Sequence, residues 1–190
     1  MNDTFALLSF YGYFVAFLLV EFVFTRTRFG SGERGNKDGR SFQMFFLGPF
    51  FGMFLWMGAI RRGWVSADPS WPMWIAGWLV GILGFAIRVI AKRQLGRFFT
   101  VRVQLQDDHR VVDTGLYRLV RHPLYLGFIL EWVAPPLILG SPAGFLFVTL
   151  WMVLGVLWRI PREEALLAEG LGQPYRDYMG RTKRLIPGVW

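Results

Sequence analysis

The stretch Arg121-His122-Pro123-Leu124-Tyr125-Leu126-Gly127 stands where a basic segment meets a long apolar run. It combines a fixed cation, a titratable imidazole, a proline suited to the first turn of a helix and an aromatic hydroxyl. His122 is one of two histidines in 190 residues. We expect the preceding segments to place this junction at a membrane surface. We expect a helical hairpin after it to return a second charged cluster, Arg162-Glu163-Glu164, to the same place.

The composition indicates an integral membrane protein. Hydrophobic residues make up 54% of the chain, and the charged residues are confined to blocks. Charge-free runs of 20, 19 and 27 residues cover 41–60, 69–87 and 132–158. A helix needs about 20 apolar residues to cross a hydrocarbon core of roughly 30 Å. A soluble protein with buried helices fits less well, because such helices rarely run this long. We predict one all-α domain over residues 1–190, a polytopic membrane helix bundle.

The apolar runs predict about five membrane spans. They are expected at 4–24, 41–60, 71–91 and, in a hairpin over 123–158, at 123–139 and 143–158. Three spans therefore precede residue 92, and the hairpin and a polar tail follow it. Pro49 and the Pro135-Pro136 pair are expected to bend or break their helices. With the N-terminus outside, 19 of the 21 Lys and Arg residues face the cytoplasm, as the positive-inside rule favours.

The polar segments are predicted from their local patterns. Residues 29–40 are rich in glycine and charge, which indicates a loop, and they lack the ending of a phosphate-binding loop. The alternation in residues 101–105 predicts a short strand. His109 lies among charged residues and is expected to be a solvated loop histidine. Residues 162–168 are helical in character, and Tyr175 and Tyr178 are spaced to share one face of a following turn.

Several classes of function are excluded or disfavoured. The net charge of +8 is explained by cytoplasmic loops facing anionic headgroups, so no nucleic-acid partner is predicted. The chain has no cysteine, which excludes disulfides and thiolate metal sites. The two histidines are 13 positions apart, and no metal site is predicted from them.

The third span carries a small-residue face and two cations one turn apart, Arg88 and Lys92. These cations either snorkel to the headgroups or, for the deeper Arg88, serve a function. Gly77, Gly81 and Gly84 would let another helix approach closely, which favours internal packing and also permits a dimer. Arg88 lies deep in this span. Glu131 lies roughly 12 Å into the hairpin at 1.5 Å per residue. An acid at that depth is a candidate catalytic residue, and the alternative is a pair with a base such as Arg88.

The two charged clusters suit an amino-acid-bearing nucleoside. Arg121 is able to hold a carboxylate or phosphate through paired hydrogen bonds. Glu163 and Glu164 accept from ammonium or hydroxyl groups, and tyrosine faces attract a sulfonium cation. Such residues at helix ends also serve as lipid anchors and salt bridges, and residue types alone leave that alternative open.

The order of motifs resembles the isoprenylcysteine carboxyl methyltransferase and phospholipid methyltransferase superfamily of integral membrane enzymes. The resemblance covers about residues 88–190. It begins with Leu95-Gly96-Arg97-Phe98-Phe99-Thr100 and continues through residues 108–112 and 115–118 to a complete Arg-His-Pro-x-Tyr-x-Gly signature at 121–127. Glu163-Glu164, Gly172-x-x-Tyr175-x-x-Tyr178 and Arg184-Leu185-Ile186-Pro187 follow. Leu171 stands where the family often has phenylalanine, and Glu131 is outside its pattern.

The resemblance implies a cytoplasm-facing pocket for S-adenosylmethionine and a lipophilic methyl acceptor. The cofactor-binding residues it implies, with the tyrosines closing over the cofactor, are His122, Tyr125, Leu126, Gly127, Glu163, Glu164, Tyr175 and Tyr178. Arg121 would orient cofactor or acceptor, and Arg121, Glu164 and Glu131 are the candidate catalytic residues. The acceptor is a prenylated cysteine carboxylate, a lipid amine or a small hydrophobic molecule. An NADPH-dependent lipid or sterol reductase and a non-catalytic membrane scaffold are the alternatives.

Overall fold

The computed structural model describes the backbone of residues 1–26, 39–99 and 110–190, and the side chains of residues 1–22, 48–99 and 110–190. Seven α-helices and one 3-10 helix lie within these ranges. They are α1 (Asp3–Arg26), α2 (Gly39–Arg61), α3 (Trp71–Leu95), η2 (Gly96–Phe98), α4 (Leu116–Leu119), α5 (Pro123–Ile138), α6 (Pro142–Leu171) and α7 (Gln173–Arg181). The predicted all-α class is confirmed. The strand predicted at 101–105, His109 and residues 29–38 of the predicted loop fall outside the described residues.

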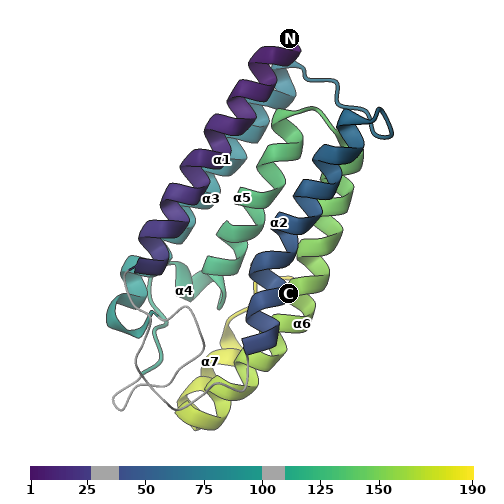
Figure 1. Ribbon diagram of the computed structural model, residues 1–190. Coiled ribbons are helices and arrows are strands. Elements are labelled where there is room, and N and C mark those ends of the chain that lie inside the picture. The colour runs from purple at the N-terminus through teal and green to yellow at the C-terminus, as the bar shows by residue number, and fades with distance from the viewer. Residues whose placement is uncertain (27–38, 100–109) are drawn as a thin grey trace.

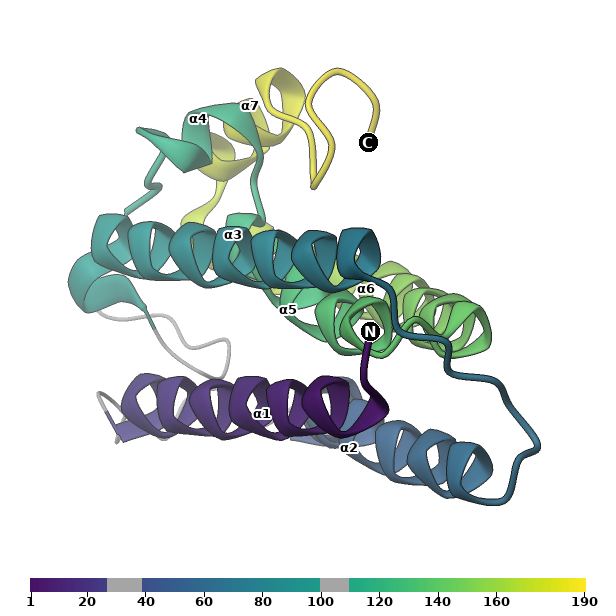
Figure 2. The same cartoon turned by 90° about the horizontal axis from the view of Figure 1, so that it is seen from above.

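The long helices α1, α2, α3, α5 and α6 run side by side, and α4 and α7 gather at one end of the bundle (Figure 1). Seen from above, α1 and α2 lie on one side of α5 and α3 on the other, and α4, α7 and the last residues lie beyond α3 (Figure 2). The junction at 121–127 therefore sits at the end of the bundle where the two short helices meet α5 and α6.

Three of the described helices are long and apolar enough to cross a membrane. They cover Asp3–Phe22, Trp71–Phe98 and Pro142–Leu171. Along α6, Leu146, Leu150, Leu154 and Leu157 are all exposed on the surface at helical spacing, as a lipid-facing stripe requires. The chain is a multi-pass integral membrane protein. Helix α5 is apolar but has only 16 residues, so the count of five spans stays a prediction.

Prolines stand at the start of α5 and α6. Pro123 and Pro142 stand at the first helical position, where a missing N–H costs no helix hydrogen bond. Ser141, wholly buried before Pro142, accepts from the backbone N–H of Gly144 at 3.3 Å and donates to the carbonyl of Ser66 at 2.9 Å. Its hydroxyl thus caps α6 and fixes the connection between α2 and α3.

Two predicted helix boundaries need correction: a break at Pro135-Pro136, and the end of the second hairpin arm at 158. Pro135 and Pro136 lie inside α5, which continues through both and ends two residues later. Pro161 lies inside α6, so the predicted hairpin arm ending at 158 and the predicted helix at 162–168 form one continuous helix. Pro161 lacks the backbone N–H that would otherwise bond to the carbonyl of Leu157. In the same turn, Nη1 of Arg162 donates to the carbonyl of Trp158 at 2.6 Å.

The small-residue face of α3 packs inside the molecule. A Cβ added at Gly84 would lie 2.7 Å from the carbonyl oxygen of Gly127 on α5. A Cβ added at Gly77 would lie 2.8 Å from the backbone nitrogen of Ile138, and at Gly81 it would overlap the ring of Tyr13 from α1. Since α5 and α1 cover this face, a dimer of the chain would have to use another surface.

Candidate functional site

The last residues of the chain fold back onto the junction. Val120 and Lys183 form a parallel β-bridge. The backbone N–H of Arg121 donates to the carbonyl of Lys183 at 2.7 Å, and that of His122 donates to the carbonyl of Arg184 at 3.0 Å. This short pairing brings residues about 60 positions apart in sequence to the start of α5.

The centre of the site is the carboxylate of Glu164, which is buried on α6. Arg121 donates to its Oε1 from Nε at 2.8 Å, and His122 Nε2 lies 3.1 Å from the same oxygen. Arg184 donates to its Oε2 at 2.9 Å. Charge-assisted bonds of this kind are about twice as strong as neutral ones. Glu164 therefore ties together α6, the start of α5 and the returning tail.

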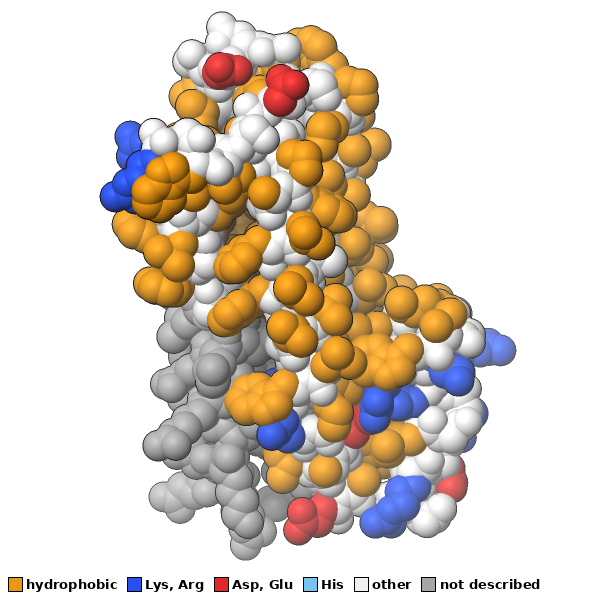
Figure 3. All heavy atoms as spheres, turned by 90° about the vertical axis from the view of Figure 1, so that its right-hand side faces the viewer, with side chains coloured by type: hydrophobic (Ala, Val, Ile, Leu, Met, Phe, Trp, Pro, Cys, Tyr) orange, Lys and Arg blue, Asp and Glu red, His pale blue; other side chains and the backbone are white. Residues whose placement is uncertain are grey.

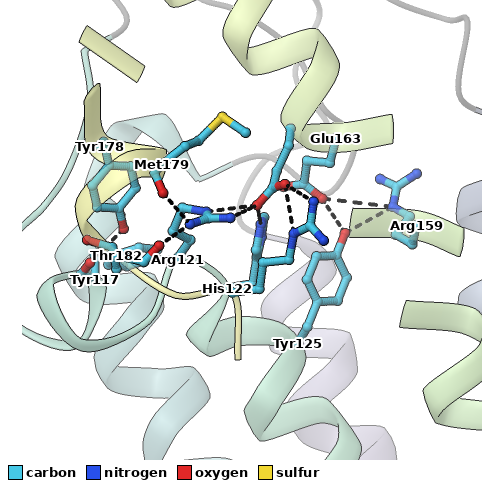
Figure 4. A network of polar contacts seen from close by, with 11 residues as sticks. Tyr117, Arg121, His122, Tyr125, Arg159, Glu163, Tyr178, Met179 and Thr182 are labelled. Atoms are coloured by element: carbon cyan, nitrogen blue, oxygen red, sulfur yellow. Dashed lines mark hydrogen bonds and ion pairs between the residues drawn. The ribbon is translucent and has the colours of Figure 1, made fainter. Parts of the chain in front are cut away.

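Arg121 is engaged on more than one side. Its Nη1 donates to the carbonyl of Met179 at 2.9 Å and also to the carbonyl of Thr182, while Nε and Nη2 face Glu164 (Figure 4). These contacts hold the end of α7 against the junction. The sequence suggested that the guanidinium of Arg121 binds a substrate. In the structure, its N–H groups instead bond largely to Glu164 and to backbone carbonyls of the protein.

Glu163 has a different environment from its neighbour. Tyr125 donates its hydroxyl hydrogen to Glu163 Oε2, and Arg159 Nε donates to the hydroxyl of Tyr125 at 2.9 Å (Figure 4). The side chain of Glu163 is 20% exposed, whereas that of Glu164 is 2% exposed. Only Glu163 of this pair is open to a molecule arriving from outside.

Three tyrosines from α4 and α7 complete this end of the bundle. Tyr178 donates to the backbone carbonyl of Tyr117 at 2.6 Å, and the rings of Tyr175 and Tyr178 lie 5.9 Å apart, edge to face. Burial raises the pKa of Tyr175 and Tyr178, so both phenols stay protonated at neutral pH. The hydroxyl of Tyr117 is buried and has no hydrogen-bond partner among the described residues.

The structure brings together most of the predicted site residues. Arg121 and His122 contact Glu164, and Tyr125 contacts Glu163, so two clusters stand side by side on adjacent glutamates (Figure 4). The rings of His122 and Tyr125 lie 5.7 Å apart, where the two clusters meet. Leu126 follows on α5 and is partly buried. Tyr175 and Tyr178 flank these clusters from α7, and their roles toward a cofactor stay a prediction.

Two of the predicted site residues lie against α3 instead. A Cβ on Gly127 would lie 2.5 Å from the Cγ of Arg88. Glu131 is fully buried deeper in the bundle, where its Oε2 accepts from Nη1 of Arg88, which also donates to Glu21 of α1. The pairing of Glu131 with Arg88 is confirmed, and a part for Glu131 in chemistry stays a prediction.

Sequence reasoning missed two residues of the site. Arg159 is 2% exposed and lies one turn before Glu163, a spacing that also fits an ordinary lipid anchor. Tyr117 was noted only within a motif, since nothing in its spacing shows where its hydroxyl lies. Arg159 lies in the site because α6 is continuous, and Tyr117 lies there because α4 contacts α7. The sequence pattern specifies neither arrangement.

Comparison with known proteins points to one family. Residues 77–169, about half of the chain, match the model of the isoprenylcysteine carboxyl methyltransferase (ICMT) family. Over these residues, the chain is similar to the ICMT family. The matched residues include the signature at 121–127 and the two glutamates Glu163 and Glu164. Most residues that contact Glu164 therefore lie within the part of the chain that matches the family model.

Individual relatives agree with the family match. A probable protein-S-isoprenylcysteine O-methyltransferase of Oryza sativa subsp. indica is 34% identical over 126 residues, which are 63% of each chain. A methanethiol S-methyltransferase of a Pseudomonas species is 29% identical over 64% of this chain and 51% of its own length. The chain thus spans between half and two thirds of the length of these relatives.

A solved structure shares the fold. The eukaryotic intramembrane Ras methyltransferase ICMT superposes with a TM-score of 0.59 at 24% identity, covering 96% of this chain and 63% of that one. The arrangement of helices described here is therefore an ICMT-like intramembrane fold.

Proposed function

We propose that the chain transfers a methyl group from S-adenosylmethionine to the carboxylate of a prenylated cysteine. The observation that carries this proposal is the Glu164 network, which assembles the Arg-His-Pro-x-Tyr-x-Gly signature, the paired glutamates and the tail at one end of a membrane bundle. The relatives named for isoprenylcysteine methylation support the choice of acceptor.

The residues present fit S-adenosylmethionine. The buried hydroxyl of Tyr117, which has no partner among the described residues, needs a polar ligand atom or water. The partly exposed carboxylate of Glu163 and the aromatic face of Tyr175 suit an ammonium or sulfonium cation. His122, Tyr125, Leu126 and Tyr178 would line the same pocket. When bound, the cofactor supplies a methyl group made electrophilic by its sulfonium sulfur.

The side chains divide into positioning and binding roles. Glu164 and Arg121 hold the tail and α7 against α5 and act as positioning residues. Glu163, oriented by Tyr125 and Arg159, faces the ligand. The main task of such a site is to align acceptor and methyl group and to exclude water.

The choice of a carboxylate acceptor rests on the relatives named for isoprenylcysteine methylation. The Arg159 guanidinium, buried on α6 one turn before Glu163, adds positive charge beside the site that would favour an anionic acceptor. A carboxylate is nucleophilic without a general base. Glu131, a candidate base deep in the bundle, is already bonded to Arg88. A prenyl tail would remain between the spans while its carboxylate meets the site.

The orientation in the membrane is part of the proposal. Cation–π pairs mark both ends of the apolar region, Arg62 over Trp64 at 5.3 Å and Arg162 over Trp158 at 4.3 Å. The site lies just beyond the second pair. The excess of Lys and Arg at this end supports a cytoplasmic site, with five spans and the N-terminus outside.

Titration with S-adenosylhomocysteine, measured by calorimetry on purified protein in detergent, tests the pocket. We expect micromolar binding by the wild type, loss of at least tenfold in affinity in Glu163→Gln, and no change in Glu169→Gln, an exposed glutamate on the same helix. Binding of NADPH instead would favour a reductase. A well-folded protein that binds neither would favour a scaffold, and both results contradict the proposal.

A further inference from the structure

Residues 185–190, here called the 185–190 loop, form a tight turn with an apolar tip. Gly188 adopts a left-handed φ of 77° after Pro187, which lets the chain reverse. Ile186 and Val189, on either side of this pair, are 53% and 71% exposed. Large apolar side chains at the tip of a turn are unfavourable in water, because nothing removes their surface from solvent.

The base of the loop is fixed firmly to the protein. The backbone N–H groups of Leu185 and Ile186 both donate to the carbonyl of Trp190 at 2.8 Å. Leu185 is buried in the hydrophobic core, and the Arg184 guanidinium lies 5.2 Å from the ring centroid of Trp190. The exposed tip is therefore held in place by the fold and is not a frayed end.

The loop lies beside the bundle near the level where the spans end. In Figure 1 the last residues lie near the height at which α1 and α3 end, above α7. Figure 3 shows the lobe at this end with apolar side chains along its upper edge, continuous with the apolar surface of the bundle, and with Lys and Arg side chains farther out. Lys183, which forms the β-bridge with Val120, and Arg118, two residues before Val120, are both exposed.

We propose that the tip of the 185–190 loop inserts into the interfacial layer of the bilayer that the bundle spans. Apolar side chains beside exposed cations match the boundary between acyl chains and anionic headgroups. The loop follows directly from Arg184, which bonds to Glu164, so this membrane contact would hold the tail over the site from its outer side.

The absence of cysteine from the chain allows one label at a chosen position. Val189→Cys carries a fluorescent label, and Arg176→Cys, exposed on α7 in the same lobe, is the matched control. Both variants are reconstituted into vesicles of phosphatidylcholine and phosphatidylglycerol. The fluorescence is then quenched either by nitroxides attached to lipid chains or by iodide in the water. Circular dichroism and thermal unfolding confirm that both variants remain folded.

We expect lipid-attached nitroxide to quench the label at 189 about threefold more strongly than that at 176, because an interfacial segment sits roughly 5–10 Å into the headgroup boundary. Iodide should show the opposite order. Equal quenching at the two positions would overturn the proposal. Protection of position 189 from both quenchers would also overturn it, since protein and not lipid would then cover the tip. None of these outcomes depends on methyl transfer.

Discussion

Two adjacent residues, Glu163 and Glu164, illustrate what single side chains contribute. Glu164 accepts hydrogen bonds from Arg121 and Arg184 and contacts His122, and it is almost fully buried. Glu163 is bonded to Tyr125 and remains partly exposed. The sequence predicted both as site residues but could not separate their roles, because the separation depends on which face of α6 turns toward the returning tail.

Glu164→Gln should destabilise the protein. The substitution leaves two guanidinium groups without their shared carboxylate, and breaking a buried ion pair costs about 3–5 kcal/mol. Arg184 is 29% exposed, which places the expected cost at the lower end. Thermal unfolding in detergent measures the effect, with Glu163→Gln for comparison. Equal melting temperatures for the two variants would contradict the positioning role of Glu164.

Stability should fall at alkaline pH through the buried tyrosines. The folded state raises the pKa of Tyr178, mainly through burial, above its unfolded value of about 10. The contribution of Tyr178 to the free energy of unfolding is therefore complete below pH ~10, and it is lost as the pH rises toward the pKa of the folded state. Tyr178→Phe should flatten the decline in melting temperature above pH ~10 relative to the wild type. Identical pH profiles for the two proteins would contradict this.

At the scale of elements, α3 and α5 pack closely against each other, and both helices were predicted. The glycines of α3 indicated a packing face, and the structure adds Gly127 of α5 as its counterpart. The sequence could not specify that α6 continues through Pro161. A proline weakens a helix locally, whereas tertiary contacts of both halves decide whether the helix goes on.

Gly84→Ala should disturb this helix pair. The new Cβ would meet the backbone oxygen of Gly127 at 2.7 Å, and overpacking of this kind costs about 1–3 kcal/mol. Gly12→Ala on α1 is the matched control, because nothing lies within 4 Å of its Cβ. Thermal unfolding of both variants in the same detergent should show a lower melting temperature for Gly84→Ala only. A neutral Gly84→Ala would contradict the close packing.

The cluster of Glu21, Arg88 and Glu131 links three helices. Arg88→Leu leaves the buried carboxylate of Glu131 without its cation and should cost about 3–5 kcal/mol. Arg88→Leu combined with Glu131→Leu should recover much of that loss, because no buried charge then stands alone except the partly exposed Glu21. Unfolding by denaturant measures both. A double variant as unstable as the single one would argue against the ion pair.

Glu131→Gln distinguishes a structural role of Glu131 from a role in methyl transfer. The amide can still accept a hydrogen bond from Arg88, so we expect a small change in stability and, if Glu131 only supports the bundle, methyl transfer within about threefold of wild type. Loss of kcat by more than about a hundredfold with an unchanged melting temperature would instead place Glu131 in the reaction.

At the scale of the molecule, charge and hydropathy predicted a membrane bundle with its site at one end. The long apolar runs made the helices recognisable, and the motif order located the site. The pairing of Val120 with Lys183 could not be predicted, because two short polar segments far apart in sequence carry no pattern that selects each other. That pairing is what places Arg184 on Glu164.

The orientation can be tested with single cysteines. Ser66→Cys, in the connection between α2 and α3, should react with an impermeant maleimide added to intact cells. Arg176→Cys on α7 should react only after the cells are opened, because 19 of the 21 Lys and Arg residues lie on the side predicted to be cytoplasmic. The reverse pattern would contradict the proposed topology while leaving the fold intact.

The most direct test of the account is a methyl-transfer assay. The purified chain in phospholipid vesicles receives S-adenosylmethionine with an isotopically labelled methyl group and a farnesylated N-acetylcysteine. We predict a labelled methyl ester that base hydrolyses to labelled methanol, formed by the wild type and by Glu169→Gln but not by Glu163→Gln. Transfer to a thiol or an amine but never to this carboxylate, by protein that binds S-adenosylhomocysteine, would contradict the account.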